Sequence, residues 1–145
     1  MEFIYPAKIE DDGAGFFLVT FRDIPYGATD GKSIDEALAE AVDCLDEVIA
    51  GCITDGLDLP IPSSQEAGEY PIRLSAQMAA KAALYIAFKK TGITKSELAR
   101  QLNTDPREIR RMLDPKHPTK LPRIEEALAV MGFRLGVSMM EVAAA

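Results

Sequence analysis

The first part of the chain changes its hydrophobic pattern from a period of two residues to a helical period. Residues 2–9 alternate large apolar residues with others, residues 16–21 are rich in strand-forming side chains, and the sequence EDDGAG between them favours a turn. We therefore predict an antiparallel hairpin. Because proline cannot donate to a strand ladder, Pro6 indicates that the first strand lies at a sheet edge or is irregular there. A third short strand is expected at 26–29.

The helical period begins at Ser33. Ser33 and Glu36 have the spacing of a capping box, and apolar residues then recur every three or four positions until Gly56, where the helix should stop. The positions between them are mostly Asp and Glu, so the predicted helix has one apolar face and one strongly acidic face. A further strand at 70–74 follows the turn-rich stretch 59–69. This part is therefore expected to fold as β-β-β-α-β, with one long helix across a small sheet.

Helical periods dominate the second half of the chain. Apolar spacing predicts one helix over 76–91, ended by Gly92, and another over 122–131, ended by Gly132. The closing sequence FRLGVSMMEV, residues 133–142, alternates like a strand. The fold class is therefore expected to be α+β, with a β-β-β-α-β module followed by an all-α domain that carries a terminal strand.

Between those helices, residues 94–114 match a helix, a tight turn and a second helix. Both helices begin with the spacing of a capping box, the first at Thr94 and the second at Asp105. Asn103 occupies the turn, where a residue that tolerates positive φ is needed. The pattern predicts a helix-turn-helix of the DNA-binding kind, with an ordinary pair of packed helices as the alternative. The apolar residues expected to be buried are Leu98, Ala99, Leu102, Ile109, Met112 and Leu113.

Composition changes this picture mainly through charge. The formal net charge of the 145 residues is −7, but residues 1–69 hold 3 Lys or Arg against 16 Asp or Glu, whereas residues 70–145 hold 13 against 7. This asymmetry favours an acidic domain over residues 1–69, extending to about residue 74, and a basic domain over residues 75–145. We expect the basic domain to bind nucleic acid and the acidic one a cationic partner. Two solvated surfaces of unequal charge are the alternative.

The sequence contains little that indicates a membrane, a metal or catalysis. No apolar run approaches the roughly 18 residues that span a membrane, and the first residues do not have the pattern of a signal peptide, so we expect a cytosolic protein. His117 is the only histidine and lies in a loop without the partners of a triad. Asp11 and Asp12 could bind Mg²⁺, but adjacent acids in a turn make a poor site. We expect no catalytic residue, no metal, no cofactor and no enzyme activity.

The sequence DIPYGATDGKSIDEALAEAVDCL at 23–45, placed after a hairpin and before a helix-turn-helix that ends in LPRIEEALAVMGFRL, resembles the HicB antitoxin family over essentially the whole chain. The stretch 29–41 is the more specific part. Family members often have Pro-Gly-Cys where this chain has Pro25, Tyr26 and Gly27. The resemblance implies a partial ribonuclease H fold fused to a DNA-binding domain. It does not imply ribonuclease activity, which needs several carboxylates that converge on two metals.

The resemblance also implies two partners, a HicA-like toxin that cleaves mRNA and the operator DNA of the antitoxin's own operon. Charge complementarity favours toxin contacts from the hairpin and the third strand, at Glu10, Asp11, Asp12 and Tyr26. A homodimer or a dimer of dimers is expected because one such unit reads few base pairs, with the terminal strand and the helix at 122–131 as candidate surfaces. The residues expected to contact DNA are Thr94, Lys95, Ser96, Thr104, Arg107, Arg110, Arg111, Lys116 and Lys120.

Two functions of other classes fit the same pattern. A metal-dependent nuclease would use the acidic residues of the first part, and the basic part would deliver it to nucleic acid. A ligand-sensing repressor would instead have a pocket between the sheet and the long helix.

Overall fold

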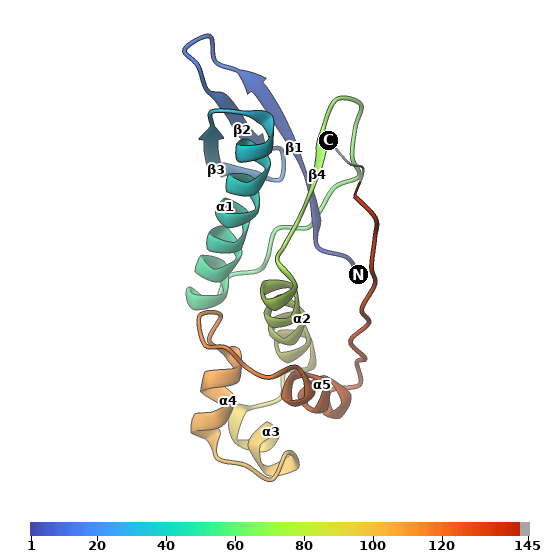
Figure 1. Ribbon diagram of the computed structural model, residues 1–145. Coiled ribbons are helices and arrows are strands. Elements are labelled where there is room, and N and C mark those ends of the chain that lie inside the picture. The colour runs from blue at the N-terminus through green and yellow to red at the C-terminus, as the bar shows by residue number, and fades with distance from the viewer. Residues whose placement is uncertain (143–145) are drawn as a thin grey trace.

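The computed structural model describes residues 1–142 and shows an elongated molecule with the sheet at one end and three short helices at the other (Figure 1). The expected α+β class and the order β-β-β-α-β followed by helices are confirmed. The strands are β1 (Ile4–Asp11), β2 (Phe17–Phe21), β3 (Ile24–Gly31) and β4 (Tyr70–Arg73), and the helices are α1 (Ile34–Thr54), α2 (Ala76–Thr91), α3 (Lys95–Gln101), α4 (Pro106–Leu113) and α5 (Leu121–Val130).

The sheet is antiparallel, in the order β3-β2-β1-β4. Of the two alternatives for Pro6, an edge strand is wrong, because β1 lies between β2 and β4. Leu74 N–H donates to the Phe3 carbonyl at 3.2 Å, so alternation along β1 directs the backbone nitrogen of Pro6 away from β4. The nitrogen of Pro6 therefore points to the β2 side of β1, but the ladder between β1 and β2 extends only as far as the pair Ala7 and Phe21. Pro6 therefore occupies an inner strand at a position where no neighbour needs its N–H.

Helix α1 covers one face of the sheet. Ser33 caps it by accepting a hydrogen bond from Glu36 N–H at 3.1 Å, as the sequence predicts. The turn from β3 into α1 is so close that a Cβ on Gly31 would lie 2.4 Å from the Ala37 nitrogen, so only glycine fits there. The side chains between the sheet and α1 form the sheet core, which includes Tyr5, Val19, Phe21, Ile24, Ala41, Leu45, Ile49 and Ile72.

Helix α2 takes part in two cores. Met78, Ala82 and Tyr85 pack in the sheet core, whereas Ala80 and Leu84 belong to a second cluster. Figure 1 shows α2 between the sheet with α1 and the three short helices. The second cluster, called the helical core below, also includes Ala87, Leu98, Ala99, Ile109, Met112, Ile124, Ala127, Leu128 and Met131.

The predicted terminal strand is wrong. Residues 133–142 have no regular secondary structure, and Figure 1 shows the end of the chain running from α5 past α2 toward the sheet end. Phe133 N–H donates to the Leu128 carbonyl at 2.8 Å, which closes α5. Within the described part of the chain, the backbone of 134–142 makes no hydrogen bond after that point. The alternating pattern is real, but a strand also needs a neighbouring ladder, and within residues 1–142 this segment has none.

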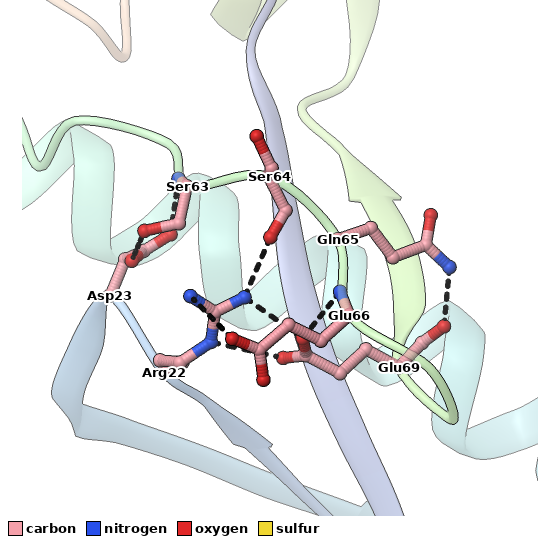
Figure 2. A network of polar contacts seen from close by, with 7 residues as sticks. All are labelled: Arg22, Asp23, Ser63, Ser64, Gln65, Glu66 and Glu69. Carbon is pink, nitrogen blue, oxygen red and sulfur yellow. Dashed lines mark hydrogen bonds and ion pairs between the residues drawn. The ribbon is translucent and has the colours of Figure 1, made fainter.

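A polar network attaches the long loop before β4 to the turn between β2 and β3 (Figure 2). Arg22 donates to the Glu69 carboxylate at 2.8 and 3.3 Å and to the Ser64 carbonyl at 2.7 Å. Asp23 accepts from Ser63 N–H at 2.8 Å and from the Ser63 hydroxyl. Glu69 is 6% exposed, and its hydrogen bond with Arg22 holds the pKa of its carboxyl below the usual range. The network thereby fixes where β4 joins β1.

The ion pair between Arg22 and Glu69 leads us to predict that the protein becomes less stable at acid pH. In the window from the lowered pKa of Glu69 up to its usual value of about 4.3, the unfolded chain binds more protons than the folded protein. The free energy of unfolding therefore falls as pH decreases through that window. We expect the free energy of unfolding to depend less on pH in Glu69→Gln than in the natural protein. Urea unfolding at a series of pH values from about 3 to 7 measures this.

Glu66→Gln is the matched control, because the Glu66 side chain is 72% exposed and its oxygen lies 3.9 Å from Arg22 Nη1. The free energy of unfolding of Glu66→Gln should depend on pH in the same way as that of the natural protein. Identical pH curves for Glu69→Gln and the natural sequence would contradict the role of the buried pair.

Candidate functional site

Helices α3 and α4 and the turn between them lie where the sequence predicts them. Thr94 caps α3 by accepting from Glu97 N–H at 3.1 Å, and Asp105 caps α4 by accepting from Arg107 N–H at 2.7 Å. Asn103 has a φ of 53°, the left-handed conformation that its position requires. The capping boxes are only half formed, because the carboxylates of Glu97 and Glu108 pair with arginines one turn on.

Burial fixes which sides of the two helices face outward. Leu98, Ala99, Ile109 and Met112 are at most 2% exposed and pack in the helical core. Leu102 and Leu113 pack against the same core from partly exposed positions. The predicted apolar sides are therefore confirmed, and the charged residues of α3 and α4 are left on the outer surface.

Lys81 joins the end of α4 to α2. Its ammonium donates to the carbonyls of Met112 at 2.7 Å and Arg111 at 3.3 Å, and to the Thr119 hydroxyl at 2.6 Å. The two carbonyls belong to the last turn of α4, where a cation is favourably placed. Lys81 is 2% exposed, and this burial lowers its pKa to about 8, opposed by the carboxylate of Asp114. The hydrophobic pattern alone did not identify this lysine as important, although a lysine within the apolar run AAKAAL is a usable signal.

The three arginines of α4 are exposed but differ in their partners. Arg107 pairs with Asp105 at 3.3 Å, and Arg111 pairs with Glu108 at the same distance. Such exposed pairs contribute little to stability and exchange readily for other anions. Within residues 1–142, Arg110 makes no ion pair. Together with Lys95 it lines a cavity of about 580 Å³ that also reaches the end of α1.

The remaining candidate DNA contacts are divided between two places. Lys95 and Ser96 are exposed in the first turn of α3, after Thr94, whereas Thr104 is half-buried in the turn. Lys120 is exposed at the start of α5. Lys116 pairs with Glu47 of α1, so this side chain is turned toward the first part of the molecule. The structure thus brings together the candidates of α3 and α4 and separates Lys116 from them.

The candidate toxin contacts do not form one cluster. Glu10 is exposed opposite Leu18 in the ladder, near the hairpin tip. The carboxylates of Asp11 and Asp12 accept hydrogen bonds from backbone N–H groups of the same turn, so they serve the turn itself. Tyr26 lies at the other end of β3, 69% exposed, with its hydroxyl 3.7 Å from the Cys52 sulfur. Tyr26 and Glu10 are therefore separate candidates.

The outer face of α1 is a further acidic surface. Its exposed carboxylates follow the three- and four-residue spacing of one helical stripe. This stripe is already visible in the sequence, although none of its residues is among the expected toxin contacts. Glu36 accepts from the Lys32 N–H at 2.9 Å, and Glu47 pairs with Lys116. Glu40 and Asp43 between them have no hydrogen-bond or ion-pair partner within residues 1–142. These two carboxylates are open to a partner.

The geometry gives little support to the other two functions. In the described part of the chain, no group of three or more His, Cys, Asp or Glu side chains is arranged to hold a metal. The space between the sheet and α1, where a ligand-sensing repressor would have its pocket, is filled by the sheet core.

Across residues 1–142, none of the helices is both long enough and apolar enough to pass through a membrane.

Comparison with known proteins gives consistent matches along most of the chain. The family model described as the HicB-like antitoxin of bacterial toxin-antitoxin systems matches residues 4–83. Antitoxin HicB 2 of Photorhabdus laumondii is 38% identical over 131 residues, which cover 90% of this chain and 92% of the relative. Antitoxin HicB of Escherichia coli K12 is 30% identical over 136 residues, covering 94% and 99%. Antitoxin HicB of Pseudomonas fluorescens is 27% identical, covering 94% of each chain.

The buried lysine predicts a specific loss of stability. Lys81→Met should lower the free energy of unfolding by about 1–3 kcal/mol, because it leaves buried oxygens at the end of α4 without their donor. Urea unfolding followed by circular dichroism measures this. Lys89→Met on the same helix is the control, because Lys89 is exposed and pairs with Asp58 at 2.8 Å. Equal losses in the two variants would contradict the role of Lys81.

Proposed function

The chain belongs to the family of HicB-like antitoxins of bacterial toxin-antitoxin systems, and from this premise we propose that it has two binding activities. The first is neutralisation of a small, mRNA-cleaving toxin of the HicA type by an acidic domain over residues 1–74. The second is repression of its own operon by a helix-turn-helix domain over residues 75–145. Three consecutive antiparallel strands followed by α1 support a partial ribonuclease H-like fold for the first domain.

The observation that carries this proposal is the separation of charge along an elongated molecule. The acidic sheet and α1 lie at one end, and the helix pair α3 and α4 lies at the other (Figure 1). Polyanionic DNA favours the basic end and is repelled by the acidic end. A ribonuclease needs a cationic surface to hold RNA, and that surface is complementary to the acidic end.

For operator binding, we propose that α4 enters the major groove. Arg107, Arg110 and Arg111 are exposed along it, and a guanidinium can bind a guanine edge through two hydrogen bonds. The first turn of α3, with Lys95 and Ser96, is exposed beside it and suits the phosphate backbone. Lys120 at the start of α5 is a third possible phosphate contact, whereas Lys116 first has to leave Glu47.

For toxin neutralisation, we propose that long-range attraction and direct contact involve different residues. Glu40 and Asp43 on α1 are unpaired within the described residues and suit the attraction of a cationic partner from a distance. Glu10 near the hairpin tip and Tyr26 on β3 suit direct contact. Tyr26 is 69% exposed, and tyrosine is one of the residue types that are enriched at the hot spots of protein interfaces. Asp11 and Asp12 act mainly by holding the hairpin turn in shape.

Replacement of Arg107, Arg110 and Arg111 together by alanine tests the operator proposal. We expect affinity for the promoter region of the chain's own operon to fall by at least about tenfold, because loss of a base-reading arginine costs roughly 1–3 kcal/mol. Loss of phosphate contacts should also reduce the slope of affinity against salt. Fluorescence anisotropy at several salt concentrations measures both quantities.

The matched control removes the same charge from the other end, by alanine at Lys8, Lys32 and Arg73, which are exposed on or beside the sheet. It should leave operator affinity close to that of the natural protein. Normal operator binding by the α4 variant would refute the assignment of α4 as the recognition helix.

Neutralisation of Glu40 and Asp43, by Glu40→Gln and Asp43→Asn, tests the acidic helix face. The association rate with the toxin encoded beside this chain should fall several-fold at low salt, and the difference should shrink as salt rises. Stopped-flow fluorescence measures the rate. Glu125→Gln with Glu141→Gln removes the same charge elsewhere on the exposed surface. If both double variants associate at the same rate, net charge alone accounts for the effect and the α1 face has no special role.

A further inference from the structure

A cavity lies where the end of α1 meets the helix pair α3 and α4. Its volume of about 580 Å³ is within the range of roughly 300–1,000 Å³ that is typical of small-molecule sites. The end of α1 with the loop after it, α2, the first turn of α3 and the end of α4 all contribute to its walls. Figure 1 shows the end of α1 directed toward the loop that follows α4. This cavity is separate from the space between the sheet and α1, which the sheet core fills.

The more buried residues that line the cavity are apolar or aromatic. Ile53 and Tyr85 are each 7% exposed, and Phe88 and Leu113 are half-buried. The Tyr85 hydroxyl is already used, because it donates to the Leu57 carbonyl at 2.7 Å. These side chains therefore offer apolar surface and an aromatic ring, which suit a flat apolar group.

The exposed residues that line the cavity are mainly cationic. Lys89, Lys95 and Arg110 come from three different helices, and within residues 1–142 Asp114 is the one acidic residue that lines the cavity with them. Lys89 pairs with Asp58 at 2.8 Å. The side chains of Lys95 and Arg110 have no ion pair with another residue of the described part of the chain. In a protein of net charge −7, an anion is thus attracted to this cavity by two free cations.

We propose that this cavity binds a small phosphate-bearing ligand with a flat apolar part, which is the chemistry of a nucleotide. The planar guanidinium of Arg110 binds two phosphate oxygens, and Lys95 adds a second positive charge. The base stacks on Phe88 and packs against Leu113. A phosphate ion alone leaves the apolar part of the cavity unfilled, so both parts of the ligand contribute to binding.

The nucleotide and the operator compete for the same two cations. Lys95 and Arg110 are also the proposed DNA contacts, so a bound nucleotide lowers operator affinity. This consequence rests on the proposed operator binding, whereas the binding of a nucleotide does not. The DNA backbone is the other source of phosphate, and it reaches the exposed cations. Its bases stay stacked in the duplex, so only a free nucleotide also fills the apolar part of the cavity.

Isothermal titration of the full chain with ADP, in the presence of EDTA, tests the binding directly. We expect a micromolar dissociation constant for ADP and binding of inorganic phosphate that is weaker by at least about tenfold, because phosphate lacks the stacked base. Arg110→Gln should weaken ADP binding by at least about tenfold, because it removes a charge-assisted contact with two hydrogen bonds. Arg100→Gln is the matched control, because Arg100 is 71% exposed on α3, pairs with Glu97 and does not line the cavity. It should bind ADP as the natural protein does.

Thr54→Trp distinguishes a free nucleotide from the DNA backbone. Thr54 is exposed at the end of α1 and lines the cavity, so tryptophan there fills the apolar part and leaves Lys95 and Arg110 in place. ADP binding should be lost, whereas operator affinity, measured without nucleotide, should stay close to that of the natural protein.

Three results would overturn the proposal and leave the two cations to the DNA backbone alone. The first is a natural protein that does not bind ADP at millimolar concentration. The second is an equal loss of ADP binding in Arg100→Gln and Arg110→Gln, and the third is ADP binding that survives Thr54→Trp. Failure of the natural protein to bind its operator would instead refute the operator proposal, and the ADP titration would be unaffected.

Discussion

Helix α2 has to be buried on two sides, and the placement of both ends of the molecule depends on that constraint. Its side chains enter the sheet core and the helical core from opposite faces. Small side chains let neighbours approach closely on both sides, which explains why the helix is rich in alanine. The one charged group buried in it, Lys81, is fully used by oxygens at the end of α4 and at Thr119. Helix α4 is thus held by the same element that supports the sheet.

Local patterns predicted the elements well, because they depend on short-range chemistry. The caps at Ser33, Thr94 and Asp105 and the positive φ at Asn103 all follow from neighbours within four residues. The features that the sequence did not predict depend on residues far apart. An inner strand tolerates Pro6 because of where the β1–β2 ladder ends. The pair of Arg22 with Glu69 and the contacts of Lys81 join residues 30 or more positions apart, and no periodicity encodes such contacts.

The candidate sites divide in the same way, into residues that local spacing identifies and residues whose position depends on the fold. Helical spacing predicts which residues of α3 and α4 face outward. Arg107, Arg110 and Arg111 could therefore be chosen from the sequence. Lys116 could not be sorted in this way, because only the fold brings it to Glu47. That ion pair and the pair of Lys89 with Asp58 connect the acidic part to the helices at two points. A partner on the acidic face of α1 would therefore bind close to a contact that reaches the basic part.

We propose that one end of this molecule binds a cationic protein and that the other end binds DNA. The most direct measurement is purification of the intact chain from cells that carry its neighbouring genes, with bound proteins identified by mass spectrometry and bound DNA by sequencing. We predict recovery of a small basic ribonuclease in a stoichiometric amount, together with enrichment of the promoter of the same operon. Recovery of the chain without any basic ribonuclease and without that promoter would contradict it.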